Sequence, residues 1–145
     1  MWAFRSIRGV FGGRSYEASG IVLVPDFQAK GIGSLLLQHF TNELKPEYLT
    51  GYTRNPAFLR AMQSTGRPVY PLDTPAYLQQ IAIQMDDASQ GYDAIYHRGR
   101  YGNAGLYGGS DPACRLLGEL SLRDRFSELQ DIATALVVVA GKTRL

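Results

Sequence analysis

Cysteine, histidine and charged residues are all scarce in this 145-residue chain. The single cysteine, Cys114, excludes an internal disulfide framework and a cysteine-rich zinc site. With only His39 and His97, a histidine-based metal centre is not expected either. Charged residues make up 19% of the chain and the formal net charge is +2. This composition does not suggest a protein that coats nucleic acid or an anionic membrane.

Long hydrophobic runs are also missing. No segment approaches the roughly eighteen continuous apolar residues that a membrane-spanning helix needs. The first eight residues contain no apolar stretch long enough for a signal peptide. We therefore expect a cytoplasmic protein with no metal, nucleic-acid or membrane partner. Hydrophobic residues nevertheless reach 45%, enough for the core of a single domain over residues 1–145.

The order of local patterns predicts an α/β fold. Residues 15–25 read as an extended segment that ends in an apolar run over 21–24, and Pro25 stops it. Apolar residues three to four apart then predict a helix from 32 to 44. Asn55 and Pro56 open another helix, which Gly66 ends. Further strands are predicted at 48–53, 94–96 and 136–139, and further helices after Thr74-Pro75 and around 122–132. This alternation predicts a mixed central sheet flanked by helices.

The turn before the first helix is the most informative segment. It joins a buried strand to an amphipathic helix and contains Gly31 and Gly33. Such a turn leaves backbone N–H groups at the positive end of the helix dipole, where a phosphate or pyrophosphate binds well. Lys30 adds a cation. The turn is neither the dinucleotide-binding pattern nor a P-loop, and a plain connecting turn is the alternative.

The longer pattern is more specific. Gln28-Ala29-Lys30-Gly31-Ile32-Gly33, preceded by Pro25-Asp26-Phe27, resembles the acetyl-CoA signature [RQ]-x-x-G-x-[GA] of the GNAT N-acetyltransferases. The resemblance covers residues 15–70, which it implies are the acetyl-CoA-binding core, and leaves 71–145 as a C-terminal part of uncertain arrangement. It implies that the turn amides hold the CoA pyrophosphate and that the backbone of the preceding strand binds the pantetheine and acetyl groups. It also implies that the next strand splays away to admit the cofactor. The implied cofactor-binding residues are Ile21, Val22, Leu23, Gln28, Ala29, Lys30, Gly31, Ile32, Gly33, Ser34 and Asn55.

The resemblance implies transfer of an acetyl group from acetyl-CoA to an amine of a small molecule or protein. Many members carry a tyrosine acid seven residues after the asparagine, where this chain has Met62, and some carry a glutamate five residues before it, where this chain has Thr50. Two substitutes remain. Glu17 is a candidate base, the alternative being an exposed strand residue. Tyr70 is a candidate acid, the alternative being a packing aromatic.

Only about twenty residues precede the motif, whereas the family places a strand, two helices and further strands there. We therefore expect a GNAT-like sheet that lacks the usual N-terminal strand and helices. The missing wall of the acceptor site would come from the C-terminal part or from a second copy in a homodimer.

Two other functions remain open. The chain could be a non-catalytic acyl-CoA-binding or interaction module derived from a GNAT fold. It could also bind RNA through the Gly/Tyr/Arg loop at 98–109, which includes Arg98 and Arg100. We favour a loop that lies beside the acceptor site.

Overall fold

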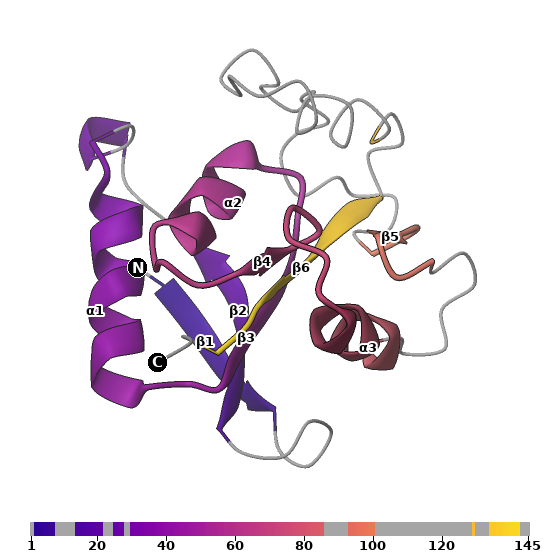
Figure 1. The fold of residues 1–145 in the computed structure, drawn as a ribbon. Helices are drawn as coiled ribbons and strands as arrows, with labels where there is room; N and C mark the ends of the chain where they lie inside the picture. The colour runs from indigo at the N-terminus through magenta and orange to yellow at the C-terminus, as the bar shows by residue number, and fades with distance from the viewer. Residues whose placement is uncertain are drawn as a thin grey trace.

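The computed structural model describes residues 2–7, 14–21, 25–27, 30–85, 93–100, 129 and 134–142 (Figure 1). Within these residues six strands form one sheet. The strands are β1 (Trp2–Ile7), β2 (Ser15–Ile21), β3 (Tyr48–Thr53), β4 (Val69–Tyr70), β5 (Tyr96–His97) and β6 (Ala135–Ala140). The helices are α1 (Ile32–Leu44), α2 (Pro56–Gln63) and α3 (Ala76–Gln84), with a 3-10 turn η1 at Pro25–Phe27. The predicted α/β class with a mixed sheet is confirmed.

The strand order is β1-β2-β3-β6-β4, and β5 also pairs with β6. Strands β2 and β3 are parallel, and every other pair among the described strands is antiparallel. Strand β3 pairs with one edge of β6. The short strands β4 and β5 share the other edge, β4 at Val139 and Ala140 and β5 at Ala135 and Leu136. The sheet therefore joins the N-terminal strands to the last described strand through β3.

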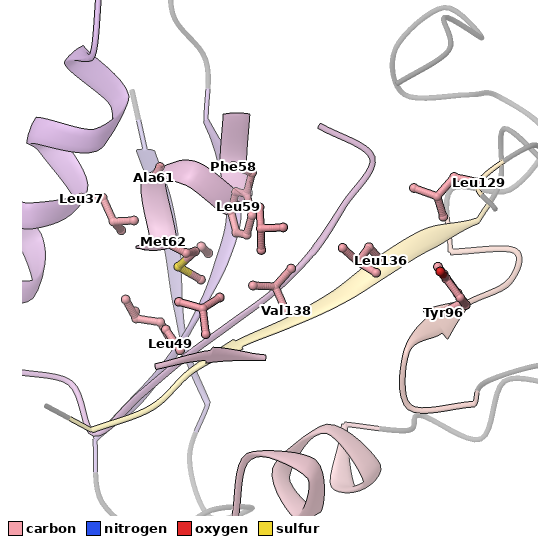
Figure 2. Close-up of a cluster of buried hydrophobic side chains, with 13 residues drawn as sticks. Leu37, Leu49, Phe58, Leu59, Ala61, Met62, Tyr96, Leu129, Leu136 and Val138 are labelled. Carbon is pink, nitrogen blue, oxygen red and sulfur yellow. The ribbon is translucent and has the colours of Figure 1, made fainter. Parts of the chain in front are cut away.

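Helices cover both faces of the sheet, and β6 is buried throughout (Figure 1). Helices α1 and α2 lie on one side and α3 on the other (Figure 1). Successive β6 residues alternate between the two cores, so Val138 packs with the α1 and α2 side and Val137 and Val139 pack with the α3 side. Figure 2 shows the first core, which includes Leu37 of α1, Leu59 of α2 and Val138 of β6. A strand buried on both faces explains the uninterrupted apolar run that predicted it.

The helices start and end close to where the sequence predicts. Helix α1 ends at Leu44, and Lys45 follows in the left-handed conformation with its N–H donating to the Thr41 carbonyl. Helix α2 ends three residues before Gly66, which has a positive φ of 72°. Helix α3 begins one residue later than predicted, because Pro75 has extended backbone angles and is the cap rather than the first helical residue.

Some elements differ from the prediction, and some predicted elements lie outside the described residues. Strands β1 and β4 were not predicted, and strand β5 lies at Tyr96–His97, slightly beyond the expected 94–96. The helix predicted around 122–132 lies outside the described residues except for Leu129, which is buried. Most of the loop at 98–109 and Cys114 also lie outside them. Across the part of the chain that is described, no helix has the length and apolar character needed to cross a membrane.

Candidate functional site

The candidate cofactor site lies where the parallel strands β2 and β3 end. Their backbones pair over only three positions, the last joining Glu17 to Thr50. Beyond this point β2 still pairs with β1, and β3 still pairs with β6, but the two strands no longer pair with each other. A register shift in the β1–β2 ladder leaves Ser19 without a partner on β1, as in a β-bulge. Bulges bend the strand that carries the extra residue, so β2 changes course just after its pairing with β3 ends.

Helix α1 begins at the same edge of the sheet. Its N-cap is Gly31, which has φ 74° and ψ 4° and makes no side-chain cap hydrogen bond. The left-handed conformation itself accounts for glycine at this position, since an ideal Cβ there would meet nothing within 4 Å. Ile32, Gly33 and Ser34 form the half-buried first turn, and Lys30 is exposed just before it. The first turn of α1 therefore carries no acidic residue and lies beside an exposed cation.

Several of the predicted cofactor residues are outside the described range. Val22, Leu23, Gln28 and Ala29 belong to this group, and Ile21 is described only as the last backbone position of β2. The end of β2 and the start of α1 thus lie at the same edge of the sheet, and part of the connection between them is outside the described residues (Figure 1).

The end of β3 contributes Asn55. Its Oδ1 accepts a hydrogen bond of 2.9 Å from the Ala57 N–H, and Pro56 is the first residue of α2, as the sequence predicted. The neighbouring Arg54 is buried and donates to the carbonyls of Leu129 and Thr134, at 2.8 and 2.7 Å. The guanidinium of Arg54 is therefore used to anchor the segment that leads into β6. Asn55 is exposed. Because β2 and β3 are parallel, both strands end at the same edge of the sheet, which is also where Gly31 opens α1 (Figure 1).

Glu17 belongs to a polar cluster on the α3 face of the sheet. It is 8% exposed, so the alternative of an ordinary exposed strand residue is wrong. Its Oε1 lies 3.4 Å from Nη2 of Arg100. The Cζ of Arg100 in turn lies 4.1 Å from the centre of the Tyr52 ring, a cation–π contact. The His97 ring meets Tyr52 edge-on, with centroids 5.3 Å apart.

The hydroxyl of Tyr52 fixes this cluster to the next helix. It donates to the Met85 carbonyl, the C-cap of α3, at 3.1 Å. The cluster, defined as Glu17, Tyr52, His97 and Arg100, therefore joins β2, β3, β5 and the segment after β5. This arrangement holds the Glu17 carboxylate in a fixed, largely desolvated position beside an aromatic ring and a guanidinium.

The other catalytic candidate, Tyr70, lies elsewhere. It is buried in β4, and its hydroxyl donates to the Ala94 carbonyl at 2.9 Å. The pairing registers place Tyr70 in the same row as Glu17 but three strands away. At the usual strand spacing this is about 14 Å. Its position favours the packing alternative.

The positions where GNAT enzymes would carry their usual acid and base are filled in this chain by buried side chains. Met62 is fully buried in the core beneath α2. Thr50 is 1% exposed, and its Oγ1 has no hydrogen-bond partner among the described residues. Neither residue supplies the proton transfer that acyl transfer requires.

Sequence reasoning missed Arg100 and His97 as members of a cluster with Glu17. Arg100 was noticed only as part of a glycine-rich loop, and no spacing rule connects residues 83 positions apart. Their association depends on β5 and β3 both flanking β6. A second feature that the sequence did not indicate is a cavity at the C-terminal end of α1.

No protein-family model matches the chain, and neither a characterised protein nor a solved structure is significantly similar to it. Within the described ranges, no three side chains of the metal-binding types gather closely enough to hold a metal ion.

Proposed function

We propose that this chain is an N-acetyltransferase of the GNAT type, which transfers an acetyl group from acetyl-CoA to an amine of a small molecule or protein. One observation carries the proposal: the parallel strands β2 and β3 stop pairing at Glu17 and Thr50, before the edge of the sheet at which Gly31 opens α1 (Figure 1). In open α/β sheets, ligands bind outside the carboxyl ends of adjacent strands. A helix N-terminus at that edge adds affinity for phosphate.

The chemistry of this edge suits a CoA thioester. Beyond Glu17, the β3-facing backbone groups of β2 pair with none of the described strands, and amide groups of a pantetheine chain would satisfy them. The first turn of α1 contains no acidic residue and its N-cap is a glycine, so the positive end of the helix dipole suits the pyrophosphate. Lys30 would add a positive charge, and the exposed amide of Asn55 would contact the cofactor from the end of β3.

Glu17 is the residue we assign as proton acceptor for the attacking amine. An amine must be neutral to attack a thioester, so a carboxylate held close to it assists the reaction. The cation–π contact and the ion pair of Arg100 hold this carboxylate in one place. Tyr70 does not share this site, because it is distant from Glu17 and its hydroxyl donates a hydrogen bond to the Ala94 carbonyl.

The described C-terminal part supplies a wall on this face. Helix α3 packs on β4 and β6, and residues 93–100 contribute His97 and Arg100 to the cluster. We assign the acceptor-site wall to these segments of the same chain, in preference to a second copy.

A specific observation favours a second function, a non-catalytic acyl-CoA-binding module. Both positions that hold the family's usual proton-transfer residues carry buried side chains that cannot perform that role, Met62 and Thr50. In this case the edge would bind the thioester and Glu17 would only form a structural ion pair.

One assay separates the two functions. The protein is incubated with acetyl-CoA and a panel of polyamines, amino acids and peptides, and free thiol is measured together with binding by calorimetry. Amine-dependent thiol release that is lost in Glu17→Gln, with acetyl-CoA affinity kept, supports the enzyme. Binding without release for any acceptor supports the module, and the absence of binding overturns both.

A further inference from the structure

A cavity of about 370 Å³ lies at the end of the molecule opposite the proposed cofactor site. It is formed where α1 ends, where α2 leads into β4 and where the chain leaves β6. These segments bring three cationic side chains to its wall, Lys45, Arg67 and Lys142, and one anionic side chain, Glu47. Glu47 pairs with Lys142 at 3.2 Å. The four residues together leave two positive charges without compensation.

Arg67 is the anchored member of this group. Its Nη1 donates to the carbonyls of Pro46 and Gly141, at 2.7 and 3.0 Å, and these two bonds fix the guanidinium in the cavity wall. Arg67 is half-buried and forms no ion pair with any described residue. Burial lowers the pKa of its guanidinium from the ordinary value, because water solvates the charge incompletely. A half-buried guanidinium held only by neutral carbonyls is stabilised by an anion.

Lys45 is the second cation with no anionic partner among the described residues. It is exposed and lies in the left-handed conformation at φ 44°, which bulky residues adopt rarely. Glycine would fit this helix end with less strain. A lysine here directs a positive charge to the cavity at a position where the backbone alone would favour a smaller residue.

We propose that this cavity is a binding site for a phosphate group, as inorganic phosphate or as a phosphate monoester. Two uncompensated positive charges match the charge of a phosphate, which is between −1.5 and about −2 near pH 7. A guanidinium fixed through one nitrogen still presents its remaining N–H groups, and the planar fork suits phosphate oxygens. The exposed amide of Asn42 adds a neutral donor at the rim.

The site is separate from the proposed acetyl-CoA site. The two lie at opposite ends of α1, whose thirteen residues span about 20 Å. The two sites share no residue, so the failure of one proposal leaves the other standing.

The test is a calorimetric titration of the full chain with inorganic phosphate and with O-phosphoserine at low ionic strength, serine being the uncharged-side-chain control. We expect Lys45→Gly to weaken phosphate binding about fivefold to tenfold through loss of one nearby charge. This variant removes a strained backbone position, so it is expected to fold as well as the parent. Arg67→Gln should weaken binding by about tenfold or more, although loss of its carbonyl bonds also affects folding. Arg60→Gln removes an exposed cation of α2 outside the cavity and should leave binding unchanged.

A phosphate can also bind at the N-terminus of α1, so the titration is repeated in Gly31→Asp. Phosphate binding that survives Gly31→Asp and is weakened by Lys45→Gly supports the cavity. Tighter binding of O-phosphoserine than of inorganic phosphate identifies a monoester as the ligand, and the reverse identifies the free ion. Unchanged affinity in both Lys45→Gly and Arg67→Gln, or equal binding of acetate and phosphate, would overturn the proposal.

Discussion

Nη2 of Arg100 lies 3.4 Å from Oε1 of Glu17, which links β2 to a segment 83 residues further along the chain. The Glu17 side chain is 11% exposed and that of Arg100 is 29% exposed, so water screens the pair only partly. The Arg100 guanidinium also covers the Tyr52 ring. These two contacts of Arg100 therefore tie Glu17, the residue that we assign as proton acceptor, to the Tyr52 ring on the α3 face of the sheet.

The strength of this ion pair can be measured by a double-mutant cycle with Glu17→Gln and Arg100→Gln. We expect a coupling free energy of about 1 kcal/mol in urea unfolding, above the median for exposed pairs because the pair is partly desolvated. The coupling should fall in high salt less than that of an exposed pair such as Arg98 and Asp93, 3.9 Å apart. Strictly additive single effects would show that the two side chains do not interact in solution.

Gly31 provides a charge test of the cofactor site. Asn and Asp both tolerate the left-handed conformation that Gly31 adopts, with φ 74°, so the two substitutions strain the turn similarly. Only Gly31→Asp places a carboxylate where the pyrophosphate would bind. We expect it to weaken acetyl-CoA binding by about a hundredfold, and Gly31→Asn by less than about tenfold, measured by calorimetry. Equal affinities in the two variants would contradict the motif assignment.

Asn55 has a structural role that must be separated from a cofactor contact. Asn55→Ala should cost about 1 kcal/mol in unfolding free energy, because the bond from the Ala57 N–H is lost. Asn55→Asp retains a capping oxygen and should unfold close to the parent. If the amide also contacts the cofactor, Asn55→Asp will weaken acetyl-CoA binding even though its unfolding free energy is close to that of the parent. An aspartate variant with parental affinity would limit Asn55 to the cap.

Gly51 is constrained by packing, not by backbone conformation. An ideal Cβ at this position would lie 2.7 Å from Cζ of Phe58, and the ring would have to move. We expect Gly51→Ala to lower the unfolding free energy by about 1–3 kcal/mol in a denaturant titration. Combining it with Phe58→Leu, which removes the clashing ring atoms, should give a double variant more stable than additivity predicts. A neutral Gly51→Ala would mean that Phe58 repacks without cost.

Local rules account for most of the secondary structure that was predicted. The helix over 32–44 follows from apolar spacing, and the start of α2 follows from asparagine and proline in the two positions that suit them. The strands missed were β1, whose residues offer no clear alternation, and the two-residue β4. Both segments are strands because they pair with a neighbouring strand, and a short window of sequence around them does not contain that neighbour.

The candidate site also has one part that the sequence predicts and another part that only the structure shows. The sequence alone identified the glycine turn before α1 and the cap at Asn55, because each depends on residues adjacent in the chain. It also determined that β6 is buried on both faces, through its continuous apolar run. Only the tertiary structure decided that Glu17 is buried with Arg100 and that Lys45, Arg67 and Lys142 share a cavity. Those groupings arise from long-range strand pairing and helix packing, in which residues far apart in the chain are brought together by the burial of other residues.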